Sequence, residues 1–138
     1  MTKHALDSFF RDYVNAFNRS DAAGIAEQWA FPATITVPSG THVFDEAAFC
    51  KNVRALCDFY RRQGVAKASK RVTSVQPLSA NVASVTTEDA LFDERGQMIA
   101  SWQHGYLLRQ DQGKIRAFAA IADGEIAAWA ARGTPLGS

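Results

Sequence analysis

The chain has 138 residues, of which 47% are hydrophobic and 21% are charged, so it is long enough for one domain (1–138) with its own core. Its 15 basic and 14 acidic residues nearly cancel, which argues against a nucleic-acid-binding protein. No apolar run approaches the roughly 20 residues that span a membrane. The charged N-terminal segment is unlike a signal peptide. Cys50 and Cys57 are separated by about two turns of a helix, too far for an unstrained disulfide. We therefore expect reduced thiols and a cytoplasmic protein.

The first third of the sequence predicts two helices. Apolar residues recur at helical spacing over residues 6–17, and residues 18–20 interrupt the pattern. Asp21 is placed as the N-cap of a second, shorter helix that carries Trp29. This helix is expected to end near Ala30, because a proline follows two residues later.

Two short strands and a third helix are expected next. The β-branched residues at 34–37 predict a strand, and 41–44 its return strand after a turn at 38–40. The third helix begins after Asp45 as N-cap and ends at Gly64.

The second half of the sequence has the alternating pattern of strands. Four strands separated by turn residues are predicted at 65–76, 82–93, 97–109 and 114–122. A short helix is predicted at 125–132. Helices followed by a long antiparallel meander indicate an α+β fold, in which the helices cover one face of the sheet.

The third strand of this meander has no cleanly polar side. Over residues 98–108 both alternating sets contain apolar side chains. We therefore expect one face of the sheet to pack on the helices and the other on a second subunit, which predicts a homodimer through the outer sheet face.

The segment Tyr13–Gly40 resembles the start of the nuclear transport factor 2-like superfamily, most closely its SnoaL-like and ketosteroid isomerase-like branches. The turn at the end of the third long strand, Tyr106–Lys114, fits the superfamily as well. The matching positions in the first segment are Tyr13, Ala16, Asn18, Asp21, Gly24, Ile25, Ala33, Thr34, Pro38 and Gly40. The resemblance implies a cone, in which a curved antiparallel sheet wraps around three helices from the N-terminal half and encloses a pocket for a small apolar molecule. It also implies dimers through the outer sheet face.

The resemblance does not imply the reaction of ketosteroid isomerase for this chain. Ketosteroid isomerase uses an aspartate base, with a tyrosine and a protonated aspartate as oxyanion donors. Tyr13 matches the tyrosine, but Val37 stands at the base position. His104 or Gly105 stands where the protonated acid is expected.

Three residues are candidate catalytic groups, each with a plainer alternative. Tyr13 is either a core aromatic with one structural hydrogen bond or a donor into the pocket. His104 is an acid/base group if it faces inward and part of the dimer surface if it faces outward. Glu88 and Asp89 point to opposite faces of their strand. A carboxylate on the inner face needs a partner or a raised pKa, whereas both are solvated if the strand end is exposed.

The remaining candidates concern the lining of the pocket. His42 is expected at the surface near the cone mouth, and the run Lys67, Lys70 and Arg71 on a solvated face. The histidines lack metal-site spacing and no phosphate-binding loop is present, so no metal or cofactor is expected. The aromatic residues expected either to line the pocket or to fill the core are Trp29, Phe31, Phe44, Phe59, Trp102 and Phe118.

Two functions are consistent with these features. The first is a cofactor-free isomerase, cyclase, dehydratase or hydrolase that uses acid/base groups on a small apolar molecule. The alternative is a non-catalytic module that binds a ligand or a protein.

Overall fold

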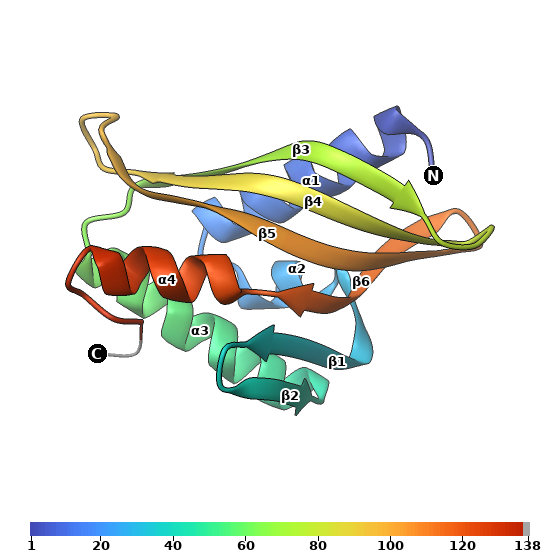
Figure 1. The fold of residues 1–138 in the computed structure, drawn as a ribbon, viewed down its shortest axis with the longest axis horizontal. Helices are drawn as coiled ribbons and strands as arrows, with labels where there is room; N and C mark the ends of the chain where they lie inside the picture. Colours follow the sequence, from blue (N-terminus) through green and yellow to red (C-terminus); the bar gives the residue numbers. More distant parts are fainter. Residues whose placement is uncertain (137–138) are drawn as a thin grey trace.

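The computed structural model, which describes residues 1–136, contains one curved sheet of six strands (Figure 1). The strand order is β2-β1-β6-β5-β4-β3. The strands are β1 (Trp29–Val37), β2 (Gly40–Phe44), β3 (Lys67–Pro77), β4 (Val82–Phe92), β5 (Met98–Asp111) and β6 (Lys114–Ile121). The four long strands form the predicted meander, with antiparallel pairs β3–β4, β4–β5 and β5–β6.

One strand pair differs from the expected antiparallel sheet. β1 and β6 run parallel, with Ile35 opposite Ala120. No tight turn joins these two strands, since β2, a helix and β3 to β5 lie between them in sequence, so their relative direction is not fixed by a hairpin. The sheet is therefore mixed, while the α+β class is as predicted.

Four helices lie with the sheet: α1 (Lys3–Asn18), α2 (Ala22–Ala26), α3 (Glu46–Arg62) and α4 (Asp123–Ala131). The side chains of Asp21 and Asp45 cap α2 and α3, as their positions predicted. None of the helices within residues 1–136 has both the length and the apolar character needed to cross a membrane.

The second helix is shorter than expected. It stops at Ala26, and Trp29 begins β1 opposite Ala117 of β6. The prediction that Trp29 lies on this helix was therefore wrong. Trp29 is apolar and stands at helical spacing from Ile25, but its strand pairing with β6 determines its conformation. Tertiary contacts of this kind often override local helix propensity.

The sheet buries the side that faces the helices. On β5, Ala100, Trp102, His104, Tyr106 and Leu108 are buried, whereas the residues between them are exposed or half-buried. The buried face of α1 packs into the same core. This settles which set of alternating residues points inward, a choice that the sequence left open.

Candidate functional site

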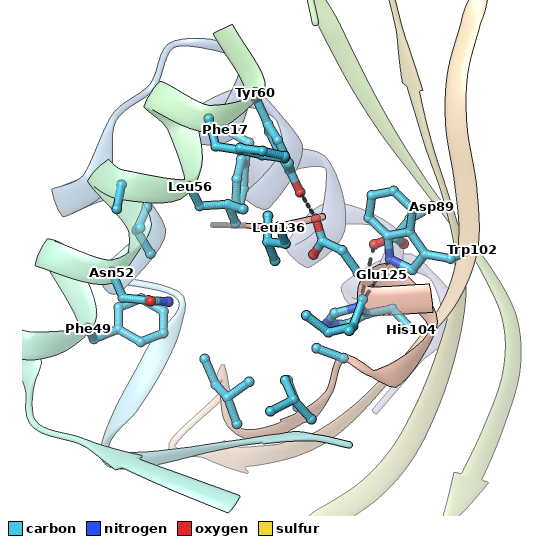
Figure 2. Close-up of a pocket in the computed structure, with 18 of the residues that line it drawn as sticks. Phe17, Phe49, Asn52, Leu56, Tyr60, Asp89, Trp102, His104, Glu125 and Leu136 are labelled. Atoms are coloured by element: carbon cyan, nitrogen blue, oxygen red, sulfur yellow. Dashed lines mark hydrogen bonds and ion pairs between the residues drawn. The ribbon is translucent and has the colours of Figure 1, made fainter. Parts of the chain in front are cut away.

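A cavity of about 490 Å³ lies between the concave face of the sheet and helices α3 and α4 (Figure 2). One wall is mainly apolar and comes from α3, β1 and β2. The opposite wall is polar and comes from β3, β4, β5 and α4. Its ionisable side chains are Lys70, Asp89, His104, Tyr106 and Glu125. A mostly apolar cavity with a few grouped polar side chains is typical of sites for small molecules.

Four of the six predicted aromatic residues line this cavity, namely Trp29, Phe44, Phe59 and Trp102. Phe31 does not line it, because its ring packs edge-on against Phe49, with 5.3 Å between centroids. Phe118 does not line it either. The β5–β6 register skips this residue, so a bulge interrupts the alternation that would turn it inward.

Tyr13, Asp89 and His104, which come from α1, β4 and β5, line the same cavity. Asp89 is 3% exposed, whereas its neighbour Glu88 points outward and pairs with Arg71. The alternative in which both carboxylates are solvated is therefore excluded. His42 is exposed and borders the cavity from β2.

Lys70 was missed by the sequence analysis, which placed it on a solvated face. Lys70 lies directly opposite Asp89 in the β3–β4 register, and its Nζ is 2.5 Å from Asp89 Oδ2. Its ammonium group also lies over the rings of Tyr13 and Tyr106, at 5.3 and 5.2 Å from their centroids. Burial lowers the pKa of Lys70, but Asp89, Tyr13 and Glu125 together outweigh this effect and leave the pKa above its ordinary value. Lys70, whose side chain is 11% exposed, is therefore a largely buried cation.

The two oxygens of the Asp89 carboxylate are both engaged. Oδ2 contacts Lys70, and Oδ1 accepts a hydrogen bond of 2.7 Å from the hydroxyl of Thr87, which is fully buried. His104 Nδ1 lies 4.0 Å from Oδ2, beyond hydrogen-bond distance. The carboxylate of Asp89 is thus held by β3 and by its own strand.

His104 is buried and neutral. Its Nδ1 accepts a hydrogen bond of 3.3 Å from the indole nitrogen of Trp102. Burial, and next the charge of Lys70, lower the pKa of His104 to about 3. Its other ring nitrogen, Nε2, has no hydrogen-bond partner among residues 1–136.

Tyr13 has the structural hydrogen bond that its plainer interpretation required. Its hydroxyl accepts from Trp29 Nε1 at 3.1 Å. Burial, and next the neighbouring Tyr106, raise the pKa of Tyr13 well above its ordinary value, so the phenol stays protonated. Tyr13 thus makes a structural hydrogen bond and also lines the cavity.

Glu125 is the second residue that sequence analysis missed. It lies at the start of α4, where its carboxyl group faces the cavity and meets the hydroxyl of Tyr60 from α3 (Figure 2). Trp129, one turn later, donates its indole N–H to the same oxygen, Oε2, at 3.2 Å. Burial raises the pKa of Glu125 above its ordinary value, although both hydrogen bonds oppose the rise. The available signal was an acidic residue four positions before a tryptophan on one face of a short helix.

A close approach of α4 to the sheet places Glu125. A Cβ on the preceding residue, Gly124, would lie 2.4 Å from the backbone oxygen of Gln103 on β5. Only glycine permits this contact, because no real Cβ sits so close to a backbone oxygen. The first turn of α4 is therefore pressed against β5 beside His104.

Two polar atoms of this wall have no hydrogen-bond partner among the residues that the structure describes. They are Nε2 of His104 and Oε1 of Glu125, since both hydrogen bonds to Glu125 end on Oε2. Val37, at the position of the isomerase base, lines the cavity as an apolar residue. Among residues 1–136, no three His, Cys, Asp or Glu side chains gather as a metal site would require. The site therefore offers Nε2 of His104 and Oε1 of Glu125 to a bound molecule, beside other polar lining groups that include Lys70 and Tyr106.

Comparison with known proteins identifies the fold. The family model described as NTF2-like protein (DUF6841) matches residues 4–125. None of the curated proteins matches the sequence. The family match confirms the resemblance found in the segment Tyr13–Gly40.

Solved structures with the same fold share little sequence with this chain. An NTF-2 like protein of unknown function from Shewanella oneidensis has a TM-score of 0.68 at 10% identity, covering 88% of this chain and 98% of that one. A ketosteroid isomerase-like protein from Erwinia carotovora atroseptica has a TM-score of 0.61 at 18% identity, covering 86% and 92%. A putative scytalone dehydratase from Novosphingobium aromaticivorans has a TM-score of 0.64 at 10% identity, covering 86% and 80%. At these identities the likeness shows the fold alone.

Proposed function

The chain belongs to the NTF2-like family (DUF6841), and we propose that it is an enzyme of this fold that moves a proton on a small, mostly apolar molecule with acid/base groups of its own. The observation that carries the proposal is the convergence of Glu125 and His104 on one cavity, each with a polar atom that no residue within 1–136 binds. Isomerisation and dehydration are the reaction types that the names of two similar structures suggest.

Glu125 is the proton-transferring group in this proposal. Burial raises the pKa of Glu125 above its ordinary value, which makes its carboxylate a stronger base. Tyr60 and Trp129 hold Oε2, so the carboxyl is oriented with Oε1 toward the bound molecule. Such an oriented base typically contributes about 100- to 10,000-fold to a rate.

His104 is the hydrogen-bond donor. A neutral imidazole whose Nδ1 already accepts a bond carries its proton on Nε2. That proton is placed to stabilise negative charge that develops on an oxygen of the molecule when Glu125 removes a proton. Tyr13 and Asp89, first considered as catalytic groups, form the supporting wall through Lys70.

The apolar wall determines what the cavity accepts. Phe49, Val53 and Leu56 of α3 face the polar wall across the cavity. Leu136, beyond α4, also borders the cavity. Burial of apolar ligand surface here supplies about 25 cal/mol per Å². The ligand is thus a mostly apolar molecule with one oxygen function.

A proton-transfer probe tests this function without knowledge of the natural substrate. 5-Nitrobenzisoxazole opens when a base removes its C3 proton: the N–O bond breaks, and a coloured cyanophenolate forms. We expect binding by calorimetry and turnover that Glu125→Gln lowers by at least about 100-fold. Glu88→Gln, which removes an exposed carboxylate, is the matched control and should retain the rate.

The outcomes distinguish the two functions. Failure of the probe to bind would overturn the proposed apolar site. Binding with no turnover above that of Glu125→Gln would favour the alternative, a ligand-binding module without catalysis. Turnover that Glu125→Gln retains would exclude Glu125 as the base.

A further inference from the structure

Each of the three tryptophans in the chain donates its indole N–H to an ionisable side chain at the cavity wall. The pairs are Trp29 with Tyr13, Trp102 with His104, and Trp129 with Glu125, at donor–acceptor distances of 3.1, 3.3 and 3.2 Å. An indole N–H only donates, so each acceptor atom must offer a lone pair to it. For an imidazole this requirement decides which nitrogen carries the proton.

The contact with Trp102 has this consequence for His104. Nδ1 accepts the indole N–H and therefore carries no proton itself, so the proton of the neutral ring lies on Nε2. An acceptor near Nδ1 would favour the other tautomer. The nearest carboxylate oxygen, Asp89 Oδ2, is 4.0 Å from Nδ1 and is already bound to Lys70. The carboxylate of Asp89 therefore does not favour a proton on Nδ1, and the hydrogen bond from Trp102 decides the tautomer.

We infer that Trp102 is a positioning residue, which holds His104 as the Nε2–H tautomer and makes it a donor to an oxygen atom of the bound molecule. Its ring lines the cavity two residues before His104 on the same face of β5 (Figure 2). The consequence for ligands rests on the function proposed above, whereas the tautomer is a property of the protein itself.

Burial, and next the charge of Lys70, keep the ring of His104 neutral. Lys70 reaches it from β3 and Asp89 from β4, and Tyr106 on its own strand stacks at 4.9 Å between centroids. Burial and Lys70 lower the pKa of His104 to about 3, while Asp89 opposes them. One neutral tautomer is therefore expected throughout the neutral range.

Nitrogen NMR tests the tautomer directly. In ¹⁵N-labelled protein, long-range proton–nitrogen spectra distinguish a protonated Nε2 from a protonated Nδ1, and His104→Gln assigns the signals. We expect Nε2–H at pH 7, with a coupling between Trp102 Nε1 and His104 Nδ1 across their hydrogen bond. Protonation at Nδ1, or no such coupling, overturns the inference without any need for a tryptophan variant.

Trp102→Phe removes the donor and keeps an aromatic ring. We expect Nδ1–H to appear in at least a tenth of the molecules, because the hydrogen bond that favoured Nε2–H, about 1 kcal/mol, is lost. Trp29→Phe removes an equivalent indole donor from Tyr13 and should leave the tautomer unchanged. An unchanged tautomer in folded Trp102→Phe would show that another group fixes it.

A pair of ligands tests the consequence for binding. 1-Tetralone and 1,2,3,4-tetrahydronaphthalene share a carbon skeleton and differ in one carbonyl oxygen. We expect wild type to bind the ketone about tenfold more tightly, and Trp102→Phe to lose most of this preference. Equal affinities in wild type would overturn the donor role. These results are independent of the benzisoxazole assay, which depends on Glu125.

Discussion

Lys70 and Asp89 face each other across β3 and β4 as a registered cross-strand pair, and their side chains form an ion pair of 2.5 Å in the cavity wall. The next pair along the same two strands, Arg71 with Glu88, is also an ion pair but lies on the exposed face. Two adjacent salt bridges thus differ mainly in burial, which provides an internal comparison of what each contributes.

Lys70→Met should lower the free energy of unfolding by about 3–5 kcal/mol, because it leaves the buried charge of Asp89 without its partner. Arg71→Met, the matched change at the exposed pair, should cost less than about 1 kcal/mol. Urea unfolding of the two variants gives the comparison. Equal losses would mean that the inner pair is solvated.

Glu125→Gln should change how stability depends on pH. The pKa of Glu125 is raised above its ordinary 4.5, so the folded protein binds this proton more tightly than the unfolded chain. The stability that this supplies is present below about pH 4.5 and is lost as pH rises through the folded-state pKa. Wild type should therefore lose stability relative to Glu125→Gln over that window, by at most about 1.4 kcal/mol per pH unit. Parallel curves of unfolding free energy against pH would contradict the raised pKa.

His104→Gln should have the opposite dependence. The pKa of His104 falls from 6.5 to about 3 on folding, so the unfolded chain takes up the proton first. Wild type should lose stability relative to His104→Gln as pH falls from about 6.5 toward 3. Urea titrations at half-unit steps of pH measure the difference. If the difference in unfolding free energy between wild type and His104→Gln stays constant over this range, His104 is accessible to protons in the folded protein.

Gly124→Ala should disturb the position of α4. The added Cβ meets the backbone oxygen of Gln103 at 2.4 Å, and strain of this kind typically costs about 1–3 kcal/mol. Gly105→Ala is the control, since its Cβ would lie an ordinary 3.6 Å from Ile121. Gly124→Ala should lower both the free energy of unfolding and the benzisoxazole turnover, whereas Gly105→Ala should lower neither. Tolerance of alanine at Gly124 would indicate that α4 is free to move.

The homodimer through the outer face of the sheet stays a prediction. Ile121 is an exposed apolar residue of β6, opposite Gly105 of β5. Sedimentation at micromolar concentration should give twice the 15.1 kDa mass of the chain, and Ile121→Asp should shift it to monomer. Leu78→Asp, in the turn between β3 and β4, should leave the dimer intact. A monomeric wild type would refute the prediction.

Much of the fold followed from local signals in the sequence. The capping carboxylates of Asp21 and Asp45 and the turn residues between the long strands act within a few residues, so the sequence shows them directly. The parallel β1–β6 pair did not follow, because it joins residues more than 80 positions apart.

The site could be predicted only where its residues are marked by local patterns in the sequence. His104 stands out by its aromatic neighbours on one strand face, and Asp89 because it and Glu88 point to opposite faces of a strand, both of which are local patterns. Lys70 looked like one member of a basic run, and only its register opposite Asp89 makes it a buried cation. Glu125 becomes a cavity group through contact with Tyr60, which lies 65 residues away.

The three indole contacts make the protein its own optical reporter. Trp29 and Trp102 line the cavity, and Trp129 holds the carboxyl group that faces it. No other tryptophan in the chain dilutes their emission. Any molecule that enters the cavity alters the surroundings of these fluorophores, so ligand screening requires neither a dye nor a label.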